Sequence, residues 1–130
     1  MIGLDTCTII DIFKGNEKAK EVLQSNQEPY VATMMSYLEL FFGIDPENKK
    51  HTLEAEYYRD FFNKIQTLDL SGVACEQASK IFWTLKKQGK IIEEVDCAIA
   101  GILIANGITK IITRNAKHFE KIKQLSVISY

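Results

Sequence analysis

Short apolar segments alternate with longer helical ones along the whole chain, and this alternation most constrains the fold. The stretch from 74 to 85 shows the helical spacing, because its apolar side chains recur at i, i+4, i+7, i+8 and i+11. Short strands without a polar face are typical of parallel sheets, which helices cover on both faces. We therefore predict a doubly wound α/β fold, a three-layer sandwich around a central, mostly parallel sheet of four to five strands.

The expected elements follow from this pattern. Strands are predicted at residues 1–5, 30–33, 65–70, 110–113 and 125–130. Helices are predicted at residues 9–24, 34–44, 48–65 and 71–89, in an apolar segment that holds Asp96 and ends at Gly107, and in a shorter segment at 116–122. No repeat, low-complexity tract or Pro/Gly-rich linker interrupts the 130 residues, so we expect one domain from 1 to 130.

Three carboxylates stand in otherwise apolar surroundings and are predicted to meet at one edge of the sheet. Asp5 closes the first strand, Glu39 lies inside the second helix, and Asp96 opens the apolar helix EEVDCAIAGILIANG. In an open parallel sheet, ligands bind beyond the carboxyl ends of the strands, where the strand order reverses. The segment 113–115 leaves the fourth strand at the same edge, so four separate segments deliver polar groups to one patch.

Each of these acids also has a purely structural explanation. Asp5 and Asp96 could each cap the helix that follows. Glu39 gains nothing from capping and would need a buried cationic partner, for which Arg114 is the only clear candidate. Taken together the acids are harder to explain, because two carboxylates about 4 Å apart repel by roughly 4 kcal/mol at an effective dielectric constant of 20. A cation between them would remove this repulsion, and an all-oxygen site suits Mg²⁺ or Mn²⁺.

Charge is balanced in total but not along the chain. The net charge is −1, whereas residues 86–130 carry eight basic and four acidic side chains. This local excess suits a site that attracts anions, although a solvated charged face would have the same composition. The two histidines, His51 and His118, lie far from the three acids in sequence.

The cysteines and the hydropathy bear on the compartment. The three cysteines lack metal-type spacing, and we expect all of them to be small buried residues in a reducing environment. Neither a signal segment nor an apolar run long enough to cross a bilayer is evident. We expect a cytoplasmic protein with no membrane partner.

Four stretches of the chain carry a resemblance to a known family. They are MIGLDTCTIIDIF, SYLELFFGI, GKIIEEVDCAIAGILIANG and ITKIITRNAKHFEKIKQLSVISY, and they extend from the first residue to the last. In this order and at these separations they resemble the successive motifs of the PIN-domain family, and most of all those of the toxin ribonucleases of VapBC-type toxin–antitoxin pairs. Each motif alone would be weak, but four in register are a strong indication.

This resemblance implies a usually dimeric, metal-dependent endoribonuclease that hydrolyses RNA phosphodiester bonds as the toxin of a type II toxin–antitoxin pair. The acids of the family fall on Asp5, Glu39 and Asp96, which would hold Mg²⁺ or Mn²⁺. Asn115 completes the catalytic set, at a position near which many relatives carry an aspartate. An asparagine offers an oxygen but no charge, which weakens a second metal site and leaves the first intact.

The resemblance also assigns residues to the substrate and to partners. Thr6, Thr113, Arg114 and Lys117 would bind RNA, with Arg114 alternatively in a salt bridge to Glu39. A cognate antitoxin would lie across the aromatic stripe YYRDFF (57–62), which could equally be core, and Trp83 could lie in a homodimer interface.

Three rival functions make different demands on the sequence. A haloacid-dehalogenase-type phosphatase requires a second aspartate where Cys7 stands, and a phosphoacceptor receiver domain requires a paired acidic start and a lysine after the fifth strand. Neither pattern is present. The third rival is a PIN-like scaffold that binds RNA or protein without cleaving, which Asn115 alone favours.

Overall fold

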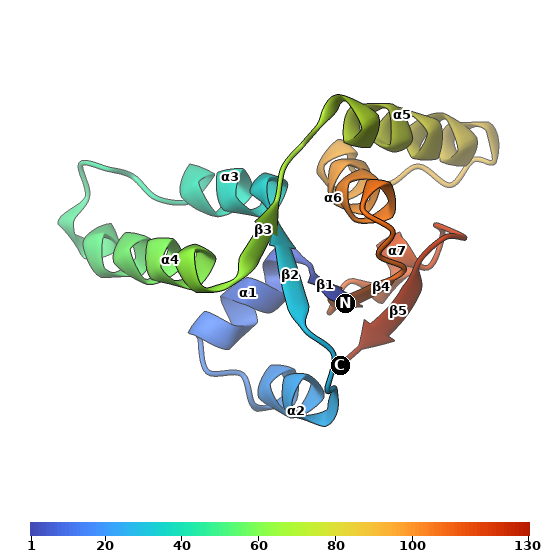
Figure 1. Ribbon diagram of the computed structural model, residues 1–130. Helices are drawn as coiled ribbons and strands as arrows, with labels where there is room; N and C mark the ends of the chain where they lie inside the picture. The colour runs from blue at the N-terminus through green and yellow to red at the C-terminus, as the bar shows by residue number, and fades with distance from the viewer.

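Five parallel strands form the centre of the computed structural model, which describes all 130 residues (Figure 1). The strands are β1 Ile2–Leu4, β2 Tyr30–Thr33, β3 Gln66–Leu68, β4 Lys110–Thr113 and β5 Ser126–Ser129. Their order in the sheet is β3-β2-β1-β4-β5, and all four neighbouring pairs are parallel. The predicted doubly wound α/β sandwich is confirmed, with a sheet that is entirely rather than mostly parallel.

Seven α-helices connect the strands. They are α1 Thr6–Phe13, α2 Glu17–Ser25, α3 Met34–Phe42, α4 Thr52–Lys64, α5 Gly72–Lys87, α6 Glu94–Ala105 and α7 Ala116–Phe119, with a single 3₁₀ turn, η1, at Lys49–His51. No helix combines the length and the apolar character that crossing a bilayer would need.

The first helical segment differs from the prediction of one helix over 9–24. It begins at Thr6 and is divided into α1 and α2, because Gly15 adopts a left-handed conformation with φ of 74°. Asn16 then caps α2, since its side-chain oxygen accepts a hydrogen bond from the backbone N–H of Ala19.

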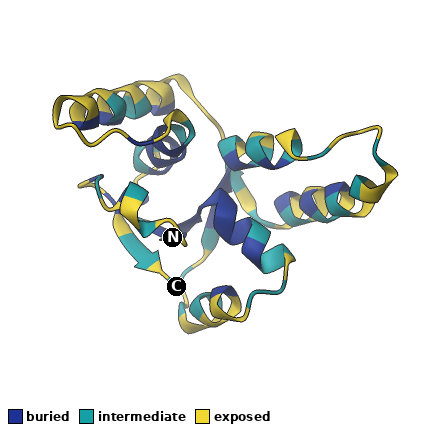
Figure 2. Cartoon of the chain, turned by 180° about the vertical axis from the view of Figure 1, so that it is seen from behind, coloured by how far each residue is buried: buried dark blue, intermediate teal, exposed yellow.

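The two faces of the sheet bury different side chains because neighbouring residues of a strand point to opposite sides. Ile2, Ala32 and Ile112 pack in a cluster with residues of α1, α3 and α4. Val31 and Ile111 pack in a second cluster with α5, α6 and α7. Figure 2 shows buried residues concentrated in the sheet and on the helix faces turned toward it. The sheet is therefore covered on both faces, as its apolar strands predict.

Two glycines allow helix α6 to lie unusually close to its neighbours, the sheet on one side and α5 on the other. A Cβ on Gly3 of β1 would lie 2.5 Å from the side chain of Leu103 in α6. A Cβ on Gly101 of α6 would lie 2.6 Å from the backbone oxygen of Ala74 and 2.7 Å from the backbone nitrogen of Ala78, both in α5. Helix α6 is thus held between the sheet and α5 at a spacing that only glycine permits.

The cysteines agree with the prediction in part. Cys7 and Cys97 are buried, whereas Cys75 is exposed on α5, and all three are free thiols. The expectation that Cys75 is buried was wrong, because Ala74 and not its neighbour occupies the inner face of α5.

Replacement of Gly101 by alanine is expected to destabilise the protein. The new methyl group would meet backbone atoms of α5 that cannot rotate away, so the free energy of unfolding should fall by about 1–3 kcal/mol. Alanine is otherwise the better helix former by about 1 kcal/mol. Urea unfolding measures the change, and Gly72→Ala is the control because nothing lies within 4 Å of its added Cβ. Equal stability of both variants would contradict this account of the α5–α6 contact.

Candidate functional site

A cavity of about 400 Å³ opens at the carboxyl edge of the sheet, beside the ends of β1 and β4. The strand order reverses between these two strands, since β1 leads toward β2 on one side while β4 and β5 lie on the other. Five carboxylates line the cavity, those of Asp5, Glu39, Glu54, Glu93 and Asp96. The three acids that the sequence singles out therefore face the same space.

Asp5 is fixed by donors from three directions. Its Oδ1 accepts a hydrogen bond of 2.8 Å from the backbone N–H of Thr6, and its Oδ2 accepts bonds from Thr113 Oγ1 at 2.7 Å and from Cys7 Sγ at 3.2 Å. The residue is only 3% exposed. Asp5 thus caps α1, as its structural explanation predicts, and lines the cavity at the same time, so its part in a metal site stays a prediction.

The side chains of Thr113 and Cys7 both donate hydrogen bonds to the Asp5 carboxylate. Thr113 is fully buried, its hydroxyl donates to Asp5, and it does not line the cavity, so its place in substrate binding stays a prediction. Cys7 lines the cavity and was not predicted as part of the site. Burial, followed by the charge of Asp5, raises the pKa of the Cys7 thiol, which keeps it protonated as a donor to Asp5.

Asp96 has a histidine partner that the sequence did not indicate. His118 of α7 lies with its Nδ1 2.7 Å from Asp96 Oδ2. Asp96 lies within the first turn of α6 and Glu93 occupies the cap position, so the helix-capping alternative for Asp96 was wrong. Burial is the main cause that raises the pKa of Asp96 from 3.8 to about 6; the His118 hydrogen bond opposes the shift, and the charges of Asp5 and Glu93 add to it.

Glu39 reaches the cavity from α3 without a partner. Its side chain is half-buried and has no hydrogen bond or ion pair within the protein. Arg114 does not pair with it, which corrects the alternative considered from the sequence. Arg114 Nη1 instead contacts both oxygens of buried Asp11, at 2.8 and 3.1 Å, and Tyr130 donates a third hydrogen bond to Asp11 at 2.6 Å.

Of the other predicted site residues, Thr6 and Asn115 line the cavity and Lys117 does not. Thr6 lines the cavity, but its hydroxyl donates to Ser36 Oγ at 2.8 Å. Asn115 also lines the cavity, with its side-chain amide free of hydrogen bonds within the protein. Lys117 is exposed and does not line it, whereas Lys14 of α1, which was not predicted, does. Lys14 is the only lysine or arginine there.

The donor chemistry of the cavity suits a hard divalent cation, because its ligands would be carboxylate and amide oxygens. The cluster of acids in one space is also costly without a counter-ion. However, no three His, Cys, Asp or Glu side chains stand in a grouping that would hold an ion directly. An ion would therefore be bound directly by fewer than three of these side chains, or the acids would have to change rotamer to reach it.

The comparisons with known proteins decide the family. The family model of the PIN domain matches residues 2–125. The chain belongs to the PIN-domain family. A search of curated proteins found no match.

Solved structures similar to this PIN domain include toxin–antitoxin complexes. VapBC-1 from nontypeable Haemophilus influenzae shares 28% identity over 99% of this chain and 98% of that one, with a TM-score of 0.78. VapBC2 from Rickettsia felis, bound to a DNA fragment from its promoter, shares 23% identity over 100% and 99%, with a TM-score of 0.82. VapC20 from Mycobacterium tuberculosis, a sarcin–ricin-loop-cleaving toxin, shares 14% identity over 85% and 87%, with a TM-score of 0.60.

The charge of Asp96 is expected to destabilise the metal-free protein. Because the folded state raises the pKa of this acid, it binds the proton more tightly than the unfolded chain does, and stability falls as the pH rises from about 4 to about 6. At pH 7.5 in EDTA, the free energy of unfolding of Asp96→Asn should therefore be about 1–2 kcal/mol higher than that of wild type. The difference should disappear near pH 3.8.

Urea unfolding at both pH values measures this effect. Glu56→Gln is the matched control, since it removes one exposed carboxylate from α4. A variant less stable than wild type at pH 7.5 would mean that the Asp96 charge supports the fold.

Proposed function

We propose that this PIN domain is a divalent-metal-dependent endoribonuclease, the toxin of a type II toxin–antitoxin pair. One observation carries the proposal: Asp5, Glu39 and Asp96 come from three different elements and face one cavity at the reversal of strand order. A buried acid with a raised pKa beside two others is costly for the fold and is typical of functional sites. The similarity to VapC toxins supports ribonuclease over other chemistries.

Mg²⁺ or Mn²⁺ is the proposed cofactor. Asp5 and Asp96 would hold the ion, with Glu39 as a direct or water-bridged ligand. When bound, such an ion lowers the pKa of a coordinated water and neutralises charge on the phosphate. Asn115 and the backbone near Thr6 would orient that water or the scissile phosphate.

The residues of the chain prepare this site before any ligand arrives. Thr113, Cys7 and the Thr6 N–H hold the Asp5 carboxylate in one orientation. His118 holds Asp96 in the same way, which matters because ligands that are oriented by hydrogen bonds bind metal ions more tightly. Lys14, at the rim of the acidic cavity, would contact a phosphate of the bound RNA. Arg114 is held on Asp11 and would contact RNA through its exposed edge.

An inactive scaffold that binds RNA or protein is the alternative function. Two observations favour it: Asn115 supplies no charge, and the acids do not converge into a group of three metal ligands. The intact set of Asp5, Glu39 and Asp96 favours the nuclease.

A homodimer and an antitoxin are the proposed protein partners, in the cytoplasm. Met34, Leu38 and Phe42 lie four residues apart on α3 and are 39%, 43% and 80% exposed, which forms an apolar stripe along one face of the helix. The aromatic segment 57–62 is less available, because Tyr58 and Phe62 are buried in the core. We assign the α3 stripe to the homodimer; Trp83, the other candidate for this interface, is exposed on α5.

Cleavage of mixed structured RNAs should require Mg²⁺ or Mn²⁺ and stop in EDTA. Asp96→Asn should lower the rate by at least about 100-fold, since even outer contacts to metal ligands are worth about 10–100-fold. Glu56→Gln should cleave like wild type. Gel analysis of the RNA products measures the cleavage by wild type with metal, by wild type in EDTA and by each of the two variants. If wild type neither cleaves RNA nor binds Mn²⁺, the scaffold is the correct function.

Charge introduced into the α3 stripe should separate the dimer. Leu38→Glu combined with Phe42→Glu would bury two unpaired carboxylates in the interface and should give a monomer by light scattering. Leu53→Glu is the control, because Leu53 is 74% exposed outside this stripe. A dimer that persists in the double variant would place the interface elsewhere.

A further inference from the structure

A second cavity lies between α5 and the segment that follows α7, and its charged lining is entirely basic. Its volume is about 160 Å³, less than half that of the acidic cavity. No acid lines it; the polar groups are three lysines and three glutamines with one threonine, namely Lys80, Lys121, Lys123, Gln77, Gln88, Gln124 and Thr84. Ile81, Leu85 and Ile122 form its apolar floor and anchor both walls in the core.

The polar groups of this basic cavity have no partners within the protein. All six ion pairs of the structure involve other residues, so none of the three lysines is paired with an acid. Lys80 and Lys123 are exposed and Lys121 is half-buried, so their ammonium groups are free to turn toward an anion placed in the cavity. The glutamine amides can donate additional hydrogen bonds to anionic oxygens.

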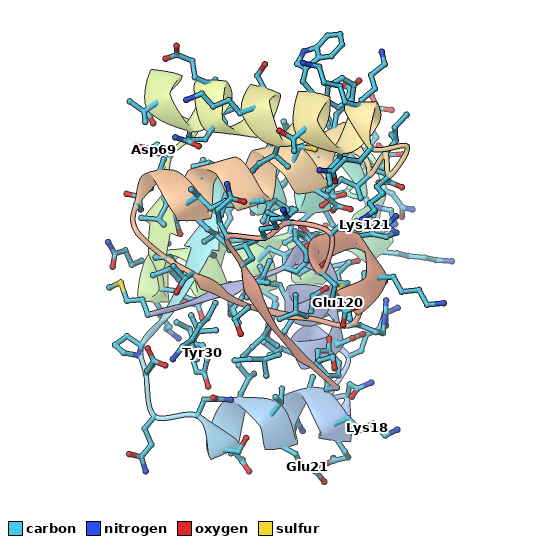
Figure 3. The ribbon with its side chains drawn as sticks, turned by 90° about the vertical axis from the view of Figure 1, so that its right-hand side faces the viewer. Lys18, Glu21, Tyr30, Asp69, Glu120 and Lys121 are labelled. Atoms are coloured by element: carbon cyan, nitrogen blue, oxygen red, sulfur yellow. The ribbon has the colours of Figure 1, made fainter.

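The basic cavity adjoins the acidic one along two short chain segments. His118 lines the acidic cavity and Lys121 the basic one, three residues further on. Three residues span at most roughly 11 Å even when fully extended. Gln88 and Glu93 make a second link of five residues between the two spaces. Figure 3 places Lys121 beside α7, below α5 and α6, and Lys18 on α2 at the opposite end of the molecule.

We propose that the basic cavity binds a backbone phosphate of the RNA strand whose scissile bond lies in the acidic cavity. The inference rests on the proposed function for the identity of the substrate. The acidic cavity holds five carboxylates and one lysine and so repels RNA on balance, which means that further attraction has to come from cations outside it. Lysines contact nucleic-acid phosphates without reading sequence. RNA is favoured over an acidic protein segment because the cavity is small enough for one phosphate and lies within a few nucleotides of the acids.

RNA binding without cleavage tests the proposal directly. A short fluorescein-labelled single-stranded RNA is titrated with the Asp96→Asn protein in EDTA over a series of salt concentrations. Addition of Lys121→Gln and Lys123→Gln should weaken binding about tenfold or more and reduce the slope of log affinity against log salt by about 0.7, the value for the one phosphate that is no longer neutralised. Lys80→Gln, on the other wall, should also weaken binding and lower the slope by no more than about 0.7, because it contacts the same phosphate.

Two control variants distinguish binding at the basic cavity from non-specific attraction by the total charge of the protein. Lys18→Gln with Lys20→Gln removes the same charge from α2 and should leave the slope nearly unchanged. Lys121→Arg with Lys123→Arg keeps the charge and should retain binding. If the α2 variant weakens binding as much as the cavity variant, the attraction is non-specific and the proposal is wrong.

Cleavage kinetics with wild-type acids provide an independent measurement. Lys121→Gln with Lys123→Gln should raise KM and leave kcat unchanged, because the contact is made equally before and during the reaction. If no RNA is cleaved but binding still depends on these lysines, the nuclease proposal fails and the phosphate site stands. If RNA binding ignores the lysines while a polyglutamate peptide requires them, the cavity binds an acidic protein segment and the inference is overturned.

Discussion

The buried carboxylate of Asp5 is the contact on which the rest of the site depends. It joins the end of β1, the first turn of α1 and the end of β4 through the Thr6 N–H and the Thr113 hydroxyl. A carboxylate that is 3% exposed is tolerated only because its oxygens accept three hydrogen bonds. The same bonds set its orientation toward the cavity. The Asp5 carboxylate therefore serves both the fold and the candidate site, so a substitution of Asp5 changes both.

The layer of α5 and α6 shows how small residues position larger ones. Gly3 and Gly101 allow α6 to lie close to both the sheet and α5. The first turn of α6 carries Asp96, so the depth at which this acid enters the cavity follows from these two approaches. The basic cavity is formed by α5 and the residues after α7. Packing at two glycines thus positions the helix that carries one of the three acids.

Much of the fold could be predicted because its signals are local. Apolar strands, helical periodicity and the acid after β1 are each visible within a few residues, and the reversal of strand order follows from the fold class. The break at Gly15 was missed because one glycine inside an amphipathic pattern is often tolerated in a helix. The exposure of Cys75 was missed because neighbouring helical residues differ in which side they face.

The partners of the charged residues could not be predicted in the same way. His118 reaches Asp96 across 22 residues of sequence, and Arg114 reaches Asp11 across 103. No local pattern encodes such contacts, although the position of His118, three residues after Asn115, was compatible with the same edge of the sheet. The prediction of a metal site from Asp5, Glu39 and Asp96 placed them in one cavity but did not foresee that no three potential ligands are grouped there to hold an ion directly.

The distance in sequence between Thr113 and Asp5, 108 residues, also has a consequence for folding. Helices α5 and α6 are neighbours along the chain and can pair early, whereas β1 and β4 close one of the longest loops available to a chain of this size. The acidic cavity needs both strands, so it is assembled only after the central pairing of the sheet. A chain in which β1 and β4 have not yet paired therefore lacks the site.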